Sequence, residues 1–305
     1  MRIAMVGLGD IARKAYLPII AMLNDLEVVL CSRNAAQLAQ LAASNRVRQF
    51  TIDVGELASM NIDAAFVHTA TESHENVVCR LLEYGIHVYV DKPLAYTLRE
   101  AQRMVALAES TNRLLMVGFN RRYAPMYEAL VHKPERRVVI MQKNRFAQAD
   151  AARRVVFDDF IHVVDTLRFL APGPIEEVRA SGESRSRRLH HVVLQLEGEG
   201  FNLLGLMNRD SGIAEETIEV MSPGNKWLVQ SLSKTTHYHA GTEQIVNAGD
   251  WDTVLWRRGF PQIIQHFVDC IRTNSPARQS AQDSLATHAL CEQIVSQLEA
   301  GSFVR

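Results

Sequence analysis

The sequence has little net charge, no long apolar run and no closely spaced cysteines. Its 33 Lys and Arg residues and 34 Asp and Glu residues leave a net charge of -1, which does not favour nucleic acid or an anionic membrane as a partner. No run approaches the roughly 20 apolar residues that span a bilayer, and the N-terminal residues lack the pattern of a signal peptide. The four cysteines form no C-x-x-C pair, as is typical of reduced thiols. We therefore expect a soluble cytoplasmic protein.

The first part of the chain has the pattern of a parallel α/β fold. Its 305 residues are enough for two domains, and the first 120 alternate short apolar runs with helical patterns. We expect strands at 2–6, 27–31, 63–69, 87–91 and 114–119, and helices at 11–23, 35–43, 73–84 and 97–111. This order predicts a doubly wound parallel sheet of the Rossmann type over residues 1–120.

The pattern changes after Tyr123 to alternating strands separated by turn signals, which indicates an open, mostly antiparallel sheet. The expected strands include 138–145, 190–197, 201–208, 215–222 and 226–232, and the expected helices are 158–170, 261–272 and 281–298. We predict a second α+β domain over 121–305. The last two helices are candidates to pack back on the first domain.

The motif VGLGDIA follows the first strand and opens a helix. Gly7 permits a tight turn, Gly9 lets backbone N–H groups approach a pyrophosphate, and the helix N-terminus favours the anion. Asp10 and Ile11 begin that helix and are candidate cofactor contacts. A G-x-G-x-x-A pattern is weak alone, but between a strand and a helix it predicts a dinucleotide site.

The end of the second strand is informative about the cofactor. An NAD enzyme usually has an Asp or Glu there for the ribose 2′-hydroxyl, whereas this chain has Ser32 and Arg33. Arg33 can bind a 2′-phosphate in a fork and Ser32 can hydrogen-bond to it, which would favour NADP roughly 10- to 100-fold. The alternative is a solvated surface arginine.

Two further stretches could supply chemistry. VYVDKPLA places Lys92 at the end of a parallel strand, where it could donate to a substrate oxygen or could simply be a solvated turn lysine. In DDFIHVVD, helical spacing would put Asp158, His162 and Asp165 on one face. That face could be a metal site, an acid/base device or the polar edge of an ordinary helix.

Four segments resemble successive landmarks of the Gfo/Idh/MocA oxidoreductases, and within them the MviM-like branch. They are VGLGDIA, DAAFVHTATESHENVVCRLLEYGIHVYVDKPLA, MVGFNRRYAP and DDFIHVVD, and they cover positions 1 to about 170. The resemblance implies a Rossmann domain, a second domain whose open sheet often mediates oligomers, a nicotinamide cofactor, and a sugar, polyol or related substrate. A homodimer or homotetramer is the expected assembly.

The resemblance also implies roles for particular residues. The family's E-K-P is Asp91-Lys92-Pro93 here, its D-x-x-x-H pair matches Asp158 and His162, and its usual glycine is Phe160, which could narrow the substrate pocket. His162 would act as the acid/base, and Lys92 would stabilise the developing alkoxide. Asp158 would bind substrate or influence the Lys92–His162 pair.

Several neighbouring residues complete the expected site. Arg121 could contact the cofactor or pair with acids, and His74 could line the cofactor cleft or serve as a first-turn helix residue. The expected cofactor contacts are Gly7, Gly9, Asp10, Ile11, Ser32, Arg33, Thr69, Thr71, His74, Lys92 and Arg121, and the expected substrate contacts are Lys92, Asn120, Asp158, Phe160, His162 and Asp165.

The hypothesis that follows is an NADP(H)-favouring dehydrogenase or reductase acting on a sugar-like or cyclic polyol alcohol. A nucleotide-binding sensor without turnover is the second hypothesis, and a metal-dependent hydrolase using Asp158, His162 and Asp165 is the third. His237 and His239 could share a strand face, but no third ligand is evident. We therefore expect no bound metal.

Overall fold

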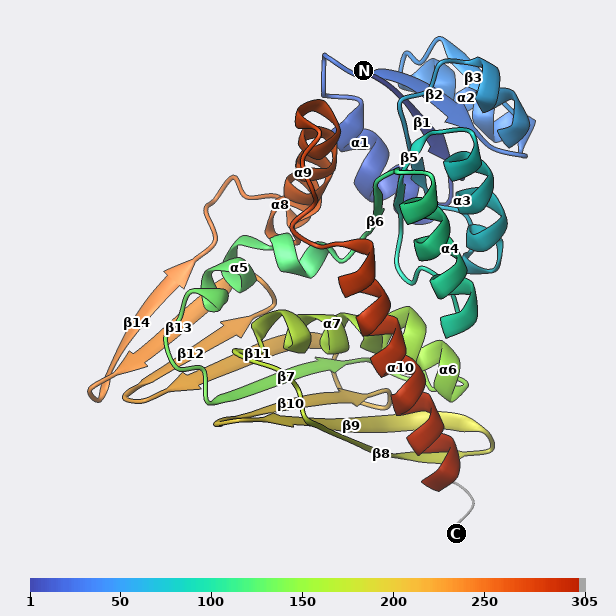
Figure 1. Cartoon of the computed structure of the whole chain (residues 1–305). Coiled ribbons are helices and arrows are strands. Elements are labelled where there is room, and N and C mark those ends of the chain that lie inside the picture. Colours follow the sequence, from blue (N-terminus) through green and yellow to red (C-terminus); the bar gives the residue numbers. More distant parts are fainter. Residues whose placement is uncertain (302–305) are drawn as a thin grey trace. The chain divides into compact units, whose positions relative to one another are not determined.

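The structure, a computed structural model, describes residues 1–301, and the chain forms two compact units (Figure 1). The first unit comprises Met1–Gly118 and Phe260–His288, and the second comprises Phe119–Gly259 and the residues from Ala289 onward. No described helix is both long and apolar enough to cross a membrane.

The first unit contains a six-stranded parallel sheet in the order β3-β2-β1-β4-β5-β6. The strands are β1 (Arg2–Val6), β2 (Glu27–Cys31), β3 (Gln49–Thr51), β4 (Ala64–Val67), β5 (His87–Val90) and β6 (Leu115–Val117). The central strands are buried on both faces, as expected when helices cover both sides of a parallel sheet. The predicted Rossmann fold is confirmed. Strand β3 was missed because its three residues, QFT, contain no apolar run.

Helices flank this sheet on both sides. They are η1 (Ala12–Tyr16), α1 (Leu17–Ile20), α2 (Ala35–Ser44), η2 (Val54–Ser59), η3 (Thr71–Ser73), α3 (His74–Glu83), α4 (Leu98–Ser110), α9 (Phe260–Thr273) and the first part of α10 (Ala281–Gly301). Figure 1 shows α3 and α4 together on one side and α1 and α9 on the other.

The first helical stretch differs from the prediction of one helix over 11–23. It begins with the π-helical η1, in which Leu17 N–H bonds to the Ala12 carbonyl, and it ends after Ile20. Pro18 has no N–H and cannot make the regular i to i−4 bond, so the backbone accommodates it with a wider turn before the proline.

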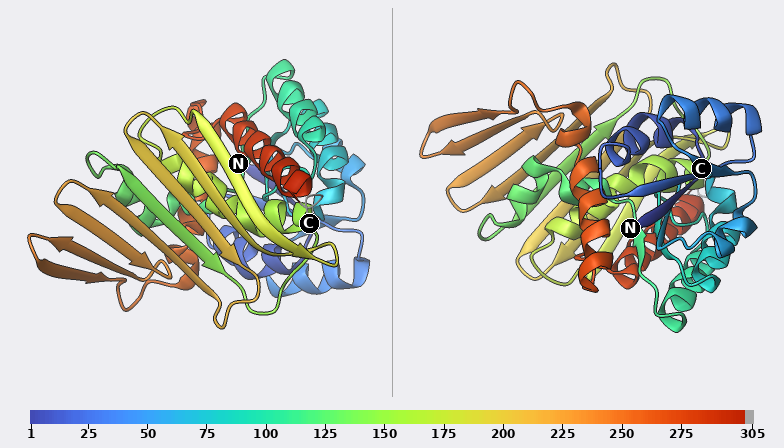
Figure 2. Two further views of the ribbon diagram at one scale, coloured as in Figure 1. Left: turned by 90° about the horizontal axis from the view of Figure 1, so that it is seen from below. Right: turned by 90° about the horizontal axis from the view of Figure 1, so that it is seen from above.

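The second unit contains an eight-stranded sheet in the order β14-β13-β12-β11-β7-β10-β9-β8, and Figure 2 shows it running from yellow β8 to brown-orange β14. The strands are β7 (Val138–Asn144), β8 (Glu177–Arg185), β9 (Arg188–Gly198), β10 (Phe201–Asn208), β11 (Glu215–Ser222), β12 (Asn225–Gln230), β13 (Lys234–His239) and β14 (Thr242–Asn247). Only β7 and β10 pair in parallel, so the mostly antiparallel prediction is confirmed.

One face of this sheet, called here the inner face, packs against helix α7 (Ile161–Leu170). The other helices of the unit are η4 (Asn120–Tyr123), α5 (Pro125–Val131), α6 (Ala152–Val155), η5 (Val156–Phe160), α8 (Val254–Arg257) and the later part of α10. Gly205 of β10 allows the close approach of α7, because a Cβ there would lie 2.8 Å from Val163 Cγ1. At the edge strand β8, the Gln297 side chain of α10 accepts from the Ala180 N–H and donates to the Val178 carbonyl.

The segment that contains DDFIHVVD is not one regular α-helix. It starts at Ala152, earlier than predicted, and passes through the π-helical η5 before α7 begins. A π-turn holds more residues than an α-turn, so side chains before and after it no longer follow the 3.6-residue period. This local change decides which carboxylates of the stretch point in which direction.

Candidate active site

A groove of about 590 Å³ lies in the first unit at the carboxyl ends of its strands. This edge is where open α/β sheets bind their ligands. The groove is lined by residues that include the predicted contacts Gly7, Gly9, Ser32, Arg33 and Thr69, together with Asn34, Asp53, His68, Glu72 and Arg80. Among the described residues, the predicted contacts Asp10, Ile11, Thr71, His74 and Lys92 lie outside this lining.

The two glycines of VGLGDIA have different roles in the groove. Gly7 has a φ of +84°, and a Cβ on it would lie 2.7 Å from the Thr69 backbone nitrogen and 2.8 Å from the His68 carbonyl carbon. A Cβ on Gly9 would meet open space, with the His68 carbonyl oxygen as its nearest neighbour at 4.0 Å. Gly7 is therefore needed for β1 and β4 to pack, whereas Gly9 leaves room for a ligand such as a dinucleotide.

The start of the following helix is exposed. Asp10 forms ion pairs with Lys14 at 2.8 Å and with Arg13 at 3.7 Å, and the Ile11 side chain is also exposed. Asp10 thus contacts cations of its own helix rather than the interior of the groove.

The groove wall after β2 holds the residues that bear on cofactor choice. Asn34 caps α2 by accepting from the Gln37 N–H at 3.1 Å, while Arg33 is exposed and forms no ion pair within the described part of the chain. The wall also holds Asp53, whose Oδ1 accepts from the Gly55 N–H at 2.7 Å. Burial, then the charges of Asp53 and Glu56, raise the pKa of the Cys31 thiol to about 12, so this thiol stays protonated.

His68 is a groove residue that sequence reasoning missed. The residue is 5% exposed, its ring lies tilted against the Tyr16 ring with the two centroids 4.0 Å apart, and neither ring nitrogen has a hydrogen-bond partner among the described residues. Burial, followed by the nearby His74, lowers the pKa of His68 to about 3, so the ring is neutral near pH 7. The only signal for it is a histidine at the end of DAAFVHT, directly before the predicted contact Thr69.

The segment after β5 carries Lys92, and two buried histidines hold the residues that follow it. His74 Nδ1 lies 2.9 Å from the Pro93 carbonyl oxygen, and its Nε2 lies 3.1 Å from the Thr69 carbonyl oxygen. His288 Nε2 accepts from the Leu94 N–H at 2.8 Å. The Lys92–Pro93 peptide bond is cis. His74 therefore serves in the first turn of α3 as a link between the groove edge and the lysine segment.

Asp91, beside Lys92, is also part of this arrangement. Its Oδ1 accepts from the Lys92 N–H at 2.8 Å, and burial raises the pKa of its carboxyl above the ordinary value. Its side chain thus supports the backbone at Lys92.

In the second unit the three acidic and basic residues predicted to share a helix face have separate surroundings. Asp158 is 40% exposed and lies 3.5 Å from Arg154. Asp165 is buried in a bidentate ion pair with Arg122, at 2.9 and 2.6 Å. The π-turn of η5 explains why Asp158 and Asp165 do not follow regular helical spacing. No group of three or more possible metal ligands occurs among residues 1–301.

Phe160 and Asp165 do not have the surroundings of substrate contacts. Phe160 is fully buried and packs over Gly205 of β10, because the π-turn directs it toward the sheet. A side chain with no exposed area belongs to the core. We therefore leave Phe160 and Asp165 out of the proposed substrate contacts.

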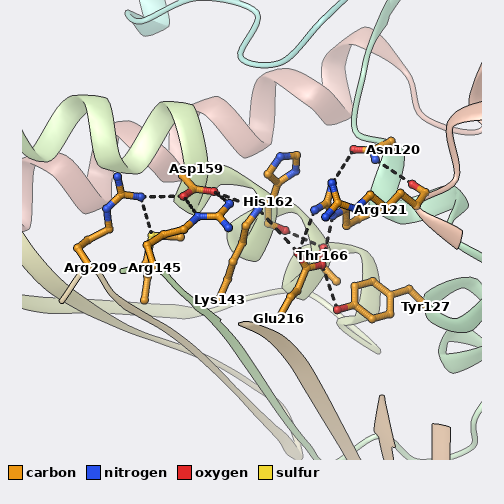
Figure 3. Close-up of polar contacts among 12 residues, drawn as sticks. Asn120, Arg121, Tyr127, Lys143, Arg145, Asp159, His162, Thr166, Arg209 and Glu216 are labelled. Atoms are coloured by element: carbon orange, nitrogen blue, oxygen red, sulfur yellow. Dashed lines mark hydrogen bonds and ion pairs between the residues drawn. The ribbon is translucent and has the colours of Figure 1, made fainter. Parts of the chain in front are cut away.

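Asp159 is the carboxylate of the stretch that lies at the centre of a charged cluster (Figure 3). It accepts from Arg145 at 2.7 and 2.9 Å and from Arg209 at 2.7 Å, and it lies 3.0 Å from Lys143 Nζ. Burial alone would raise the pKa of Asp159, but Lys143 and Arg145 hold it well below its usual range. Sequence reasoning considered Asp158 and Asp165 and missed this residue.

Glu216 of β11 forms the second half of the cluster. It accepts from Arg121 at 3.2 and 2.9 Å and from the Tyr127 hydroxyl at 3.2 Å, and lies 3.8 Å from Lys143 Nζ. Against the effect of burial, Arg121 and Lys143 lower the pKa of Glu216 to about 2. Arg121 thus pairs with an acid, one of the two alternatives expected for it.

Asn120 and His162 lie near these residues in the fold. The Asn120 amide donates to the Arg258 carbonyl at 2.8 Å and accepts from Arg121 at 3.3 Å. His162 follows Asp159 by three residues in the chain, and its side chain is buried. Its backbone carbonyl accepts from the Thr166 hydroxyl at 2.7 Å (Figure 3).

Comparisons with known proteins place the chain in a family. Residues 1–119 match the model of the Gfo/Idh/MocA oxidoreductase family with an NAD-binding Rossmann fold, and residues 125–240 match a YceM-like C-terminal domain. The protein YceM of Salmonella typhimurium is 33% identical over 96% of this chain and 97% of its own length. The dehydrogenase MviM of Clostridium difficile has a solved structure that is 31% identical, with a TM-score of 0.94 over 98% of this chain and 99% of that one.

A more distant relative, inositol 2-dehydrogenase 3 of Saccharopolyspora erythraea, is 23% identical over all of this chain and 95% of its own length. The resemblance inferred from the sequence motifs, including its MviM-like branch, is confirmed. The chain is a member of the Gfo/Idh/MocA family of oxidoreductases, with the nicotinamide-binding Rossmann fold of that family.

Proposed function

We propose that the protein is an NADP(H)-favouring dehydrogenase or reductase that acts on the alcohol or carbonyl group of a sugar-like or cyclic polyol substrate. The observation that carries the cofactor proposal is the groove at the carboxyl ends of β1, β2 and β4, with open space at Gly9 and with Ser32 and Arg33 in its wall. The inositol dehydrogenase of Saccharopolyspora supports the substrate class by its name.

The preference for NADP rests on Ser32 and Arg33, which stand where a carboxylate would select NAD. Arg33 is exposed, lines the groove, and can donate two hydrogen bonds to a 2′-phosphate.

Separate titrations of NADPH and NADH test this preference. We expect Arg33→Gln to weaken NADPH binding roughly 10- to 100-fold with little effect on NADH. Arg99→Gln, an exposed arginine of α4 outside the groove lining, is the matched control. Tighter binding of NADH than NADPH to the unchanged protein would contradict the proposal.

The chemistry of the proposed reaction needs a hydride acceptor or donor, which bound nicotinamide supplies, and groups that handle the hydroxyl proton. We propose that Lys92 donates a hydrogen bond to the reacting oxygen and that a ring nitrogen of His162 takes or returns its proton. Asp158, which is partly exposed, binds a substrate hydroxyl. The held segment around Pro93 and Leu94 gives Lys92 a defined backbone position.

A coupled absorbance screen over sugars, sugar acids and polyols with NADP(H) tests the reaction. Turnover of at least one compound class, lost in Lys92→Ala, is the expected result. Failure on every compound despite tight NADPH binding would favour a sensor or regulator that binds the nucleotide without turnover.

We also propose a homodimer or homotetramer formed through the outer face of the second unit's sheet. Half-buried aliphatic side chains gather there in neighbouring registers, with Val193 opposite Leu206 and Ile140 opposite Leu204. Such a contiguous apolar area on a sheet face is typical of a protein interface. Light scattering on the purified protein tests it, and a Leu204→Glu variant should dissociate the assembly.

A cytoplasmic location is the remaining part of the proposal. All four cysteines are free thiols, three of them buried and Cys79 half-buried, which is consistent with a reducing compartment. Cell fractionation tests the location directly.

A further inference from the structure

The inner face of the second unit's sheet is apolar over most of its area and charged at one end. Val139 and Met141 of β7 and Leu203 of β10 are buried inner-face positions. Continuing the same alternation, Lys143 of β7 and Glu216 of β11 are cross-strand partners on this face. The helical segment before α7 lies at the charged end, where Asp159 contacts three of the cations.

Positive charge exceeds negative charge in this cluster. Asp159 and Glu216 are its two carboxylates, and they are contacted by four cations, namely Arg121, Lys143, Arg145 and Arg209. Arg258 is a fifth cation close to these residues. Its pKa is lowered by burial and then by the positive charge of Arg121.

Three other acids of these segments have partners of their own within the described part of the chain. Asp158 is engaged by Arg154 of its own helical segment, and Asp165 is engaged by Arg122. Glu215 is adjacent to Glu216 in β11 and so points to the opposite face, where it accepts from the Asn144 amide.

The excess of positive charge lowers the stability of the folded protein, because much of the cluster is buried. Lys143 is 2% exposed, and burial together with Arg121 lowers its pKa to about 8. Uncompensated buried charge is among the most destabilising features that a protein can carry. A site that retains it without internal compensation is therefore suited to receive an anion.

The three cations that hold Asp159 also retain unused donors. Arg145 binds through Nε and Nη2, which leaves Nη1, and Arg209 binds through Nε and Nη1, which leaves Nη2, within the residues that the structure describes. Lys143 has three N–H groups but only two carboxylate neighbours, one of them at 3.8 Å. The Arg145 side chain is 30% exposed, so solvent and small solutes can reach this end of the cluster.

We propose that Lys143, Arg145 and Arg209 form an anion subsite that binds a carboxylate or phosphate group of the substrate. This inference rests on the proposed function and narrows its substrate class from sugar-like compounds and polyols in general to sugar acids or sugar phosphates. Asp159 holds the three cations in place, and their remaining N–H groups provide the charge-assisted hydrogen bonds.

Measuring the binding of anions to the protein, without cofactor or turnover, tests the subsite independently of the reaction. Calorimetry with D-gluconate, D-glucose 6-phosphate, inorganic phosphate and neutral D-glucose compares the two anion types with each other and with an uncharged sugar. We expect at least one anion to bind at least tenfold more tightly than glucose and to weaken as salt is added. Stronger binding of gluconate identifies the carboxylate as the preferred group, and stronger binding of the two phosphates identifies phosphate.

Arg145→Gln removes a positive charge and the unused Nη1 donors from the partly exposed end and should weaken anion binding about tenfold. Arg185→Gln, an exposed arginine of β8 in the same sheet, should leave it unchanged and is the matched control. Circular dichroism checks that both variants fold, and Arg209→Gln provides a second removal. Equal binding of glucose and all anions, no binding by any anion, or equal affinities in Arg145→Gln and Arg185→Gln would overturn the subsite. Anion binding without NADP(H)-coupled turnover would instead reject the proposed reaction while keeping the subsite.

Discussion

The groove of the first unit and the charged cluster of the second recognise ligands by different means. The groove is shaped by backbone turns after the parallel strands, at Gly7 and Gly9, and its wall also holds side chains such as Ser32, Arg33 and Asp53. The cluster is built from long charged side chains that meet from four separate segments, η4, β7, η5 and the β10–β11 region. A cofactor shared by many enzymes suits a backbone site, whereas side chains can change to suit a particular substrate. The difference suggests where the specificity of this chain is encoded.

Removing the proposed catalytic groups has the largest expected effect and tests whether both units supply chemistry. Lys92→Ala in the first unit and His162→Ala in the second should each lower turnover roughly 10²- to 10⁴-fold, because each removes a group that handles the hydroxyl proton. This corresponds to about 3–5 kcal/mol of transition-state stabilisation. Steady-state kinetics on the substrate found by screening measure it.

NADPH binding should persist in both variants, which separates loss of chemistry from loss of the fold. Undiminished turnover in both would remove the assignment. A loss confined to Lys92→Ala would place the proton chemistry in the first unit alone.

Breaking the charged cluster should cost stability in the second unit. Glu216→Gln leaves Arg121 and Lys143 buried with one carboxylate fewer, and loss of one partner of a buried ion pair typically costs about 3–5 kcal/mol. Chemical denaturation measures this change. Glu135→Gln, which breaks an exposed pair with Arg137, should have no measurable effect. A Glu216→Gln protein as stable as the parent would mean that its cluster is open to water.

The two glycines of VGLGDIA offer a matched comparison within the groove. Gly7→Ala should destabilise the protein by about 2–3 kcal/mol or more, because φ is positive there and the new Cβ would meet backbone atoms of His68 and Thr69. Gly9→Ala should leave the melting temperature nearly unchanged and weaken NADPH binding, since its Cβ would occupy open groove. Thermal melts and NADPH titrations on the same two proteins separate the effects. Equal melting temperatures for both variants would contradict the different roles given to the glycines.

The first unit and its groove could be predicted well because their signals are local. Strands β1 and β2 match the predicted ranges residue for residue, and the spacing of Gly7 and Gly9 constrains the backbone within one turn. His68 was missed because its burial in the groove depends on neighbours, such as Tyr16, that no local pattern reveals.

The charged cluster could not be predicted, for two physical reasons. A period of 3.6 residues per turn predicts a shared helix face for Asp158, His162 and Asp165. Because η5 is π-helical, this period does not hold there, and Asp159 is the residue that contacts the sheet. In addition, Arg209 lies 50 residues from Asp159 in the sequence, and the parallel pairing of β7 with β10, which places the end of β10 beside Arg145, leaves no signal in either strand.

A change of pH should distinguish the two regions with the smallest of these effects. His68 has a pKa of about 3 in the folded protein and about 6.5 when unfolded, so the unfolded chain gains a proton first as the pH falls. The stability that comes from keeping His68 neutral is complete above pH 6.5 and is lost between about 6.5 and 3, by roughly 2 kcal/mol at pH 5. Glu216, with a pKa lowered to about 2, begins to lose its contribution only below its ordinary value of 4.5. Between pH 7 and 5 the free energy of unfolding therefore includes the His68 contribution together with those of His74, His87, His237 and His266, whose pKa values burial also lowers, and His68→Phe should make its pH dependence less steep. An unchanged slope in His68→Phe would show that another group titrates in this range.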